Sequence, residues 1–276
     1  MSAPEKILVT GAAGRVGTAL RPILRERYGH TVLMDISEIE DCRAGESFRK
    51  GDIADLECLK SVADGCDGIV HLAGLVASHY TFEESFGPNY VGTHNIFRVA
   101  AEMGIENVVY ASSHHAVGFI KRGQEIDHTT AHRPDTEYGL SKAFGESAGA
   151  YFADKFGLNI LSIRIGYIGP EVPNERRLHT WISARDLAQL VEIGLRKKGM
   201  GHQIVYGVSA CDEPFFDNSN AERLGYLSLD HSLHAITDPS VLELKPDLNT
   251  IEEGVVGGGF AAFDFAGDSD RILKPS

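Results

Sequence analysis

Residues 6–17 read Lys6-Ile7-Leu8-Val9-Thr10-Gly11-Ala12-Ala13-Gly14-Arg15-Val16-Gly17, and this stretch predicts the fold of the 276-residue chain. Its first five residues form a short apolar run that predicts a buried strand. The glycines that follow predict a turn, and residues 18–28 continue with apolar side chains at helical spacing. A strand, a glycine turn and a helix in this order form the phosphate-binding unit of a dinucleotide-binding fold.

Three glycines of this stretch have separate predicted roles. Gly11 allows the tight turn, Gly14 lets the backbone approach a diphosphate, and Gly17 lets helix and strand pack closely. The diphosphate is expected on the free N–H groups at the start of the helix, beside Arg15 and Val16. The spacing Gly-x-x-Gly-x-x-Gly is one residue wider at its first gap than the common Gly-x-Gly-x-x-Gly pattern.

An acidic residue ends the next predicted strand, at residues 30–35. Asp35 follows the glycine turn at close to the offset of about 20 residues expected for a ribose-binding carboxylate. A carboxylate there accepts hydrogen bonds from the ribose 2′-hydroxyl and repels a 2′-phosphate, which favours NAD over NADP. Asp52 and Ile53 follow another short segment, and we expect Asp52 at the adenine amino group and Ile53 against the adenine ring.

The rest of the sequence alternates predicted strands and helices. Further strands are expected at 67–74, 107–112 and 159–165, and helices at 82–103 and 137–156, the first interrupted near its start by Gly87-Pro88. This alternation predicts an α/β fold, a Rossmann-type doubly wound parallel sheet with helices on both faces. Ligands of such sheets bind at the carboxyl ends of the strands. The small or polar residues at these ends are Gly11, Asp35, Ala73, Gly74, Ser112, Ser113 and Gly166.

We divide the chain into two predicted regions. Residues 1–166 form the dinucleotide-binding core, and residues 167–276 form a small C-terminal substrate-binding region interleaved with the last strands of the sheet. Glycines at 254–259 predict a loop near the C-terminus. The stretch 212–220 fits either a cover of the pocket or an interface.

Composition argues against several functional classes. The chain has 26 Lys and Arg against 39 Asp and Glu, a formal net charge of −13 and no basic tract, which argues against nucleic acid and anionic membrane surfaces as partners. No apolar run approaches membrane-spanning length or precedes a cleavage site. The four cysteines lack Cys-x-x-Cys and zinc spacings, which predicts free thiols in the cytoplasm: Cys42, Cys58, Cys66 and Cys211.

A second motif, Tyr138-Gly139-Leu140-Ser141-Lys142, indicates proton-transfer chemistry. It places a phenol and an ammonium four residues apart, on one face of a helix. A free phenol has a pKa of roughly 10, and a fixed positive charge beside it favours the phenolate and lowers that pKa. Tyr138 is therefore a candidate general base for an alcohol, although the same spacing also fits an ordinary helix pair. Ser113 ends the strand before this helix, where it either stabilises the substrate oxygen or bonds to the backbone.

These motifs together resemble those of the extended short-chain dehydrogenase/reductase superfamily. The resemblance covers most of the chain in the expected order and rests on Thr10-Gly11-x-x-Gly14-x-x-Gly17, Asp35, His71-Leu72-Ala73-Gly74, Ser112-Ser113 and Tyr138-x-x-x-Lys142. More narrowly, residues 111–118, 164–166, 176–181 and 206–210 resemble bacterial uronate dehydrogenases, which oxidise C1 of glucuronate or galacturonate with NAD to give a lactone.

The resemblance implies roles for individual residues. Tyr138 would be the base, Lys142 would support it and bind the nicotinamide ribose, and Ser113 would orient the sugar hydroxyl. Arg176 would pair with the C6 carboxylate, for which a guanidinium is well suited, although Arg176 also fits a solvated loop charge. The predicted cofactor-binding residues are Gly11, Gly14, Arg15, Val16, Gly17, Asp35, Asp52, Ile53, Leu72, Ala73, Gly74, Tyr138, Lys142 and Ile165. The predicted substrate-binding residues are Val76, Ser113, His114, His115, Tyr138, Tyr167 and Arg176.

Three positions depart from the uronate dehydrogenase pattern. Val76 stands where the family tends to have Ser, His114 where it usually has Asn, and Tyr167 where it has Ser. We expect the reaction type to survive, and the sugar to be a hexuronate or a related aldose with a phosphate or sulfonate group that would still use Arg176. His114 and His115 lack metal-ligand spacing, which predicts no metal site. One of the two is expected to line the pocket and the other to be structural.

Two further functions stay open at this point. A nucleotide-sugar epimerase or dehydratase would recycle a bound cofactor without releasing NADH, but such enzymes usually carry a longer C-terminal region. A non-enzymatic NAD-binding sensor would be expected to lack part of the catalytic set, whereas Ser113, Tyr138 and Lys142 are all present. By analogy with the superfamily we expect a homo-oligomer.

Overall fold

The computed structural model describes residues 5–274 of the chain. Within them, seven strands form one parallel sheet in the order β3-β2-β1-β4-β5-β6-β9. These strands are β1 (Lys6–Thr10), β2 (His30–Asp35), β3 (Glu46–Lys50), β4 (Gly68–His71), β5 (Asn107–Ser113), β6 (Asn159–Ile165) and β9 (His202–Gly207). The order changes direction between β1 and β4, which marks the ligand-binding crevice of a doubly wound sheet. Two short strands, β7 (Tyr167–Ile168) and β8 (Trp181–Ile182), pair with each other.

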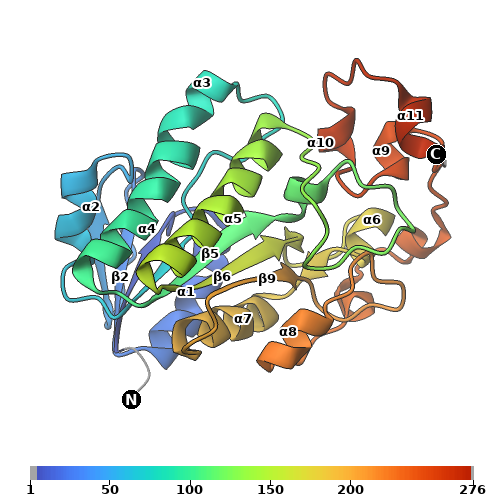
Figure 1. The fold of residues 1–276 in the computed structure, drawn as a ribbon. Coiled ribbons are helices and arrows are strands. Elements are labelled where there is room, and N and C mark those ends of the chain that lie inside the picture. Colours follow the sequence, from blue (N-terminus) through green and yellow to red (C-terminus); the bar gives the residue numbers. More distant parts are fainter. Residues whose placement is uncertain (1–4, 275–276) are drawn as a thin grey trace.

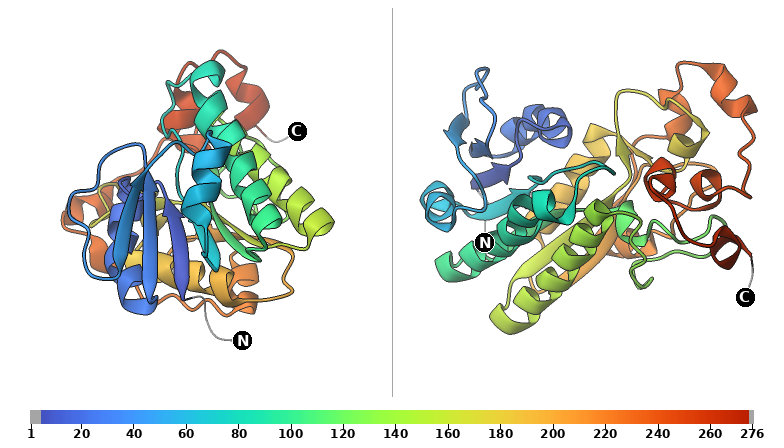
Figure 2. Two further views of the ribbon diagram at one scale, coloured as in Figure 1. Left: turned by 90° about the vertical axis from the view of Figure 1, so that its left-hand side faces the viewer. Right: turned by 90° about the horizontal axis from the view of Figure 1, so that it is seen from above.

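Helices cover both faces of this sheet (Figures 1 and 2). The long helices α1 (Arg15–Arg27) and α7 (Ala184–Arg196) pack together on one face, and α2 (Leu56–Ala63), α4 (Gly92–Met103) and α5 (Glu137–Phe156) pack on the other. The predicted α/β Rossmann-type fold is therefore confirmed. The shorter helices are α3 (Phe82–Ser85), α6 (Glu175–Leu178), α8 (Ser219–Leu224), α9 (Ile251–Gly254), α10 (Gly259–Ala262) and α11 (Ser269–Leu273). Single tighter turns are η2 (His114–Val117), η3 (Ser232–Ala235) and η4 (Pro239–Glu243).

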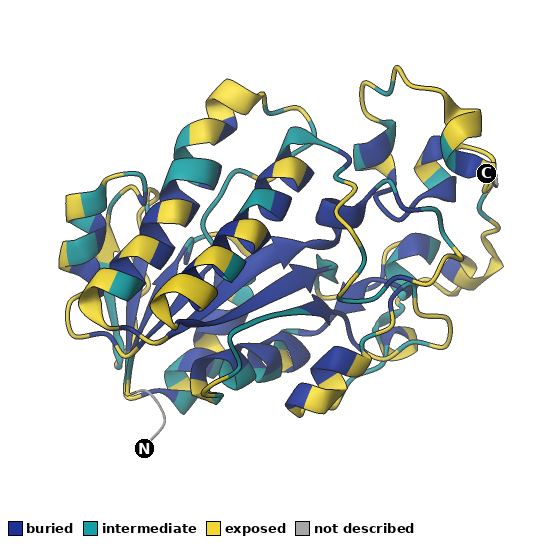
Figure 3. Ribbon diagram, in the orientation of Figure 1, coloured by how far each residue is buried: buried dark blue, intermediate teal, exposed yellow. Residues whose placement is uncertain are grey.

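Alternating side chains of the strands build two core layers, one on each side of the sheet. Ile7 and Val9 of β1 pack in the layer that contains Leu24 of α1, whereas Leu8 packs in the layer that contains Ile96 of α4. Successive residues of a strand point to opposite faces, so a strand covered on both sides is apolar throughout. Figure 3 shows the central strands of the sheet as buried, between helices with exposed outer faces, whereas no residue of the edge strand β3 is buried.

The segment predicted as a helix over 82–103 differs in detail. Gly87-Pro88 does not break it but lies in a widened π-helical turn, η1 (Phe86–Val91), that joins α3 to α4. Proline has no N–H to donate to the carbonyl four residues earlier. The N–H of Gly92 bonds instead to the oxygen of Gly87, five residues back, which keeps the helical path continuous.

The C-terminal segments lie beyond the carboxyl ends of the central strands, where α6, α9 and α10 gather in Figure 1. The stretch 212–220 packs against the core here, because the buried ring of Phe216 stacks on Tyr206 with 4.2 Å between centroids. No helix in the described part of the chain combines the length and apolarity needed to cross a bilayer.

Candidate functional site

A cleft of about 970 Å³ lies at the carboxyl ends of the strands. The predicted cofactor-binding residues line it, with the exception of Gly17, and so do the predicted substrate-binding residues, with the exception of Arg176. The cleft therefore brings the glycine turn, Asp35 and the Tyr138–Lys142 motif together, although they lie far apart in the sequence.

Two glycines of the turn are required by close contacts. Gly11 has a φ of +70°, and a Cβ at this residue would lie 2.5 Å from the backbone nitrogen of Ala73. A Cβ at Gly17 would lie 2.5 Å from the backbone oxygen of Ala12. Gly17 therefore lets α1 pack on the turn itself, rather than on the strand as predicted.

The first turn of α1 offers free backbone donors to the cleft. Its N-cap is Gly14, which provides no side-chain hydrogen bond to the helix. Asp35 fixes the turn, since its Oδ2 accepts a 2.9 Å hydrogen bond from the N–H of Ala13 and its Oδ1 one of 2.9 Å from the N–H of Ser37. Uncapped N–H groups at a helix start suit a diphosphate, and the lone pairs left on Asp35 suit a ribose hydroxyl. The turn therefore fits a dinucleotide.

Tyr138 and Lys142 lie in the first turns of α5, and both side chains are buried. The side chain of Thr136 caps this helix by accepting a 3.0 Å hydrogen bond from the N–H of Gly139. The Nζ of Lys142 lies 5.5 Å from the ring centre of Tyr138 and 5.0 Å from that of Tyr110. The helix thus presents phenol and ammonium side by side, as the spacing predicts.

The electrostatics of this pair differ from the sequence prediction. Burial raises the pKa of Tyr138 to about 12, and a hydrogen bond with Ser113 lowers this pKa only in part. Burial also lowers the pKa of Lys142 to about 8, so the ammonium that was expected to stabilise the phenolate is itself weakened. Desolvation of the phenol therefore outweighs the effects that favour the phenolate, and the pKa of Tyr138 lies above that of a free phenol rather than below it.

Glu146, a buried carboxylate on the same helix, is missing from the predicted site residues. Glu146 continues the spacing of four set by Tyr138 and Lys142, and its charge raises the pKa of Lys142 against the effect of burial. Its two oxygens accept hydrogen bonds of 2.9 and 2.8 Å from the guanidinium of Arg164 on β6. Ser112 also donates to Glu146, at 2.5 Å.

Both adjacent histidines of η2 line the cleft, so the expectation that only one would do so is wrong. The Nδ1 of His114 lies 3.1 Å from the oxygen of Ile165, and burial lowers the pKa of His114 well below its usual value. The Nδ1 of His115 lies 2.6 Å from Oδ2 of Asp135. A carbonyl oxygen only accepts, so Nδ1 of the neutral His114 ring carries the hydrogen and Nε2 is the acceptor.

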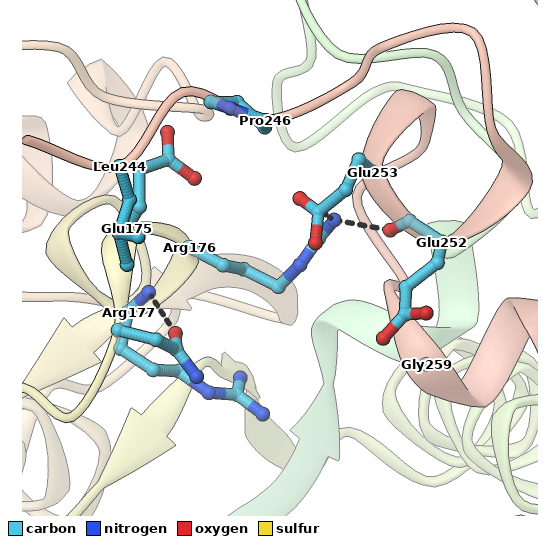
Figure 4. Close-up of a pocket in the computed structure, with 9 residues that line it drawn as sticks. Glu175, Arg176, Arg177, Leu244, Pro246, Glu252, Glu253 and Gly259 are labelled. Carbon is cyan, nitrogen blue, oxygen red and sulfur yellow. Dashed lines mark hydrogen bonds and ion pairs between the residues drawn. The ribbon is translucent and has the colours of Figure 1, made fainter. Parts of the chain in front are cut away.

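The structure does not bring Arg176 into the cleft. Figure 4 shows its side chain reaching from α6 to the C-terminal segment. There the guanidinium donates to the oxygens of Val255, at 2.8 Å, and Glu252, and pairs with Glu253 at 3.2 Å. These contacts leave Arg176 as a link between segments, at the edge of a second cavity of about 280 Å³.

Arg177, which the sequence reasoning left out, lines the cleft instead. Its guanidinium carbon lies 4.8 Å from the ring centre of Tyr167, and no carboxylate within residues 5–274 forms an ion pair with it. The Arg176-Arg177 pair in the sequence indicated a cation at this place. Which of the two arginines lines the cleft depends on the orientation of α6. Phe260 of α10 is a second lining residue that carried no sequence signal.

The other predicted substrate residues have different exposures. Val76 is 58% exposed at the rim of the cleft, whereas Ser113 is buried at its floor. No cluster of three or more His, Cys, Asp or Glu side chains in the described residues is arranged to hold a metal ion.

Comparisons with known proteins agree with this geometry. The NAD dependent epimerase/dehydratase family matches residues 7–204. A uronate dehydrogenase of Pseudomonas putida is 37% identical over 260 residues, which cover 93% of this chain and 96% of that protein. The structure of a glucuronic acid dehydrogenase from Chromohalobacter salexigens matches with a TM-score of 0.89 at 33% identity. The match covers 97% of this chain and 99% of the chain in that structure.

A further solved structure is a tyrosine-to-alanine mutant of uronate dehydrogenase from Agrobacterium tumefaciens, complexed with NAD. It matches with a TM-score of 0.87 at 33% identity, and the match covers 94% of this chain and 97% of the chain in that structure. The family match includes both the glycine turn and the Tyr138–Lys142 motif. The chain belongs to the NAD dependent epimerase/dehydratase family.

Proposed function

We propose that this protein oxidises the anomeric C1 of a small anionic sugar, a hexuronate, to its lactone with NAD. One observation carries the proposal: a single cleft joins the glycine turn to Ser113, Tyr138 and Lys142. The similarity to uronate dehydrogenases over nearly the whole chain supports the substrate class.

The chain offers a complete surface for the cofactor. The N–H groups at the start of α1 would hold the diphosphate, Asp35 the adenosine ribose, and Asp52 with Ile53 the adenine. Lys142 would bind the nicotinamide ribose. NAD supplies the hydride acceptor when it is bound.

The protein residues handle the proton and orient the sugar. Tyr138 Oη removes the proton of the C1 hydroxyl, and Ser113 Oγ holds the same oxygen. Because burial opposes the phenolate, the hydrogen bond from Ser113 and the positive charge of Lys142 have to stabilise it.

Arg177 is the proposed partner of the sugar's anionic group. It lies in the cleft without a carboxylate partner among the described residues, whereas the contacts of Arg176 are already made within the protein. A guanidinium binds a carboxylate in a bidentate fashion and also binds a phosphate, so an aldose phosphate or sulfo-sugar remains a second candidate substrate.

The test is NADH formation, followed by its absorbance, with hexuronates, neutral aldoses, aldose phosphates and sulfo-sugars. Steady NADH release with an anionic aldose is expected. Absence of release with every sugar would overturn the proposal, and interconversion of nucleotide sugars without net NADH would support an epimerase instead. A Tyr138→Phe variant should bind NAD like the wild type and lose turnover. This result would show that the hydroxyl group of Tyr138 is catalytic and that its ring is not merely structural.

We also propose that the protein forms a homo-oligomer in the cytoplasm. Residues 1–166 would form the dinucleotide-binding core, which includes the Tyr138 helix, and residues 167–276 a small substrate-binding region interleaved with the last strands. Exposed apolar side chains on α5 support association, with Tyr151 at 48% and Phe156 at 49% exposure. All four cysteines are free thiols, as a reducing compartment would leave them. Light scattering of the wild type and of a Tyr151→Arg/Phe156→Arg variant tests the association.

A further inference from the structure

Asp135 contacts His115, a residue that lines the cleft, but is not itself among the lining residues. Its Oδ2 is 2.6 Å from Nδ1 of His115, and its Oδ1 accepts a 3.0 Å hydrogen bond from Oγ1 of Thr136. The carboxylate is fully buried, and the proton transfer proposed above makes no use of it.

Three glycines from separate segments enclose this carboxylate. A Cβ at Gly118, after η2, or at Gly257, in the C-terminal loop, would overlap Oδ2 of Asp135. A Cβ at Gly139, on α5, would lie 2.9 Å from Oδ1. The absence of these side chains leaves a space shaped for one carboxylate, and it holds the Asp135–His115 contact in a fixed place.

The contact with Asp135 determines which nitrogen of His115 carries a hydrogen and which is left as an acceptor. An ionised carboxylate only accepts hydrogen bonds, so Nδ1 of His115 carries a hydrogen and Nε2 is the acceptor of the neutral ring. The ring stacks on Phe260 with 4.3 Å between centroids and meets Tyr138 edge-on at 5.9 Å. Across the described chain, no residue hydrogen-bonds Nε2 of His115, which leaves this nitrogen for a ligand.

We propose that Asp135 is a positioning residue that acts through Nδ1 of His115 and directs the Nε2 lone pair of that ring to a hydroxyl group of the bound sugar. The proposal rests on the proposed function for the identity of the ligand. The arrangement of the two side chains can be tested without any substrate.

The first test is ¹⁵N NMR of the histidine rings of the wild-type protein without sugar. We expect His115, assigned by its loss in His115→Phe, to carry its hydrogen on Nδ1 and a bare Nε2. A hydrogen on Nε2 with a bare Nδ1 would overturn the proposal, whatever reaction the protein catalyses.

The second test is a double-mutant cycle between Asp135→Asn and His115→Phe, which keeps the stack on Phe260. Asp135→Asn retains the shape that the glycines require and removes the charge. In the wild-type background it should raise the KM for the sugar by about tenfold or more, with little change in the Kd of NAD. In the His115→Phe background it should have no further effect, because a residue that acts only through His115 then has nothing to position.

An equal loss of kcat/KM in both backgrounds would show a merely structural role and overturn the proposal. Asp238→Asn, an exposed carboxylate that caps η4, serves as the control and should behave like the wild type. If the wild type forms no NADH with any sugar, the proposed function fails, and the NMR measurement still decides the role of Asp135.

Discussion

Removal of the buried charge of Glu146 should destabilise the protein more than any surface change. In Glu146→Gln the guanidinium of Arg164, 1% exposed, loses its only ionised partner among the described residues. Breaking a buried ion pair from one side costs about 3–5 kcal/mol, because the remaining charge stays desolvated. Each kcal/mol lowers the melting temperature of a chain of this size by about 2–4 °C, so a drop of about 6–20 °C is expected.

The assay is thermal and urea unfolding followed by the fluorescence of Trp181, the only tryptophan of the chain and a buried one. Glu102→Gln is the matched control, since Glu102 bonds Lys60 and Arg98 at the surface and its variant should unfold close to the wild type. The double variant Glu146→Gln/Arg164→Met should recover part of the loss, because the unpaired guanidinium is gone.

The pH dependence gives an independent check. The hydrogen bonds and charge of its partners hold the pKa of Glu146 at about 2, below its usual 4.5, despite the opposing effect of burial. The ionised form therefore contributes stability that is fully present above pH 4.5 and is lost as the pH falls towards 2. The difference between wild type and Glu146→Gln should shrink over that window. A melting temperature of Glu146→Gln within about 2 °C of the wild type at neutral pH would refute the reasoning.

Three other perturbations test separate parts of the cleft. The pKa of Lys142 is lowered to about 8 from 10.5, so the unfolded chain binds more protons than the folded chain between these pH values. The free energy of unfolding of the wild type, relative to that of Lys142→Met, should therefore rise with pH over that range. A difference between the two proteins that stays constant with pH in urea titrations would contradict the shift. Arg177→Met should raise the KM for an anionic sugar by about tenfold or more with little change in stability. Arg176→Met should instead lower the melting temperature. A higher KM in Arg176→Met and a lower melting temperature in Arg177→Met would show that the two roles are exchanged. Gly17→Ala should weaken NAD binding, measured by calorimetry, because its Cβ would press on the oxygen of Ala12; Gly87→Ala, with open space around it, is the control.

The predictions that succeeded rest on local patterns. The strand of residues 6–10, the glycine turn and the helix after it follow from apolar periodicity and from the φ of +70° that only glycine adopts easily at Gly11. The spacing of four between Tyr138 and Lys142 places them side by side on any α-helix. Alternation of strands and helices leaves few arrangements other than a parallel sheet.

The predictions that failed concern neighbours that are remote in the sequence. Arg176 donates hydrogen bonds to backbone oxygens of residues 252–256, and no spacing in the sequence predicts these contacts. Arg177, and not Arg176, therefore lines the cleft. The carboxylate of Asp135 is closely surrounded by Gly118, Gly139 and Gly257, which come from three separate segments and carried no signal for its contact with His115.

The sequence by itself determined the parallel α/β sheet, the glycine turn and the placement of Tyr138 beside Lys142, because these depend on periodicity and backbone geometry. Only the tertiary structure decided how burial shifts the pKa values of that pair, which arginine lines the cleft and which groups contact Glu146 and Asp135. The physical reason is that desolvation and ion pairing depend on what packs around a group, and a spacing in the sequence does not give that packing.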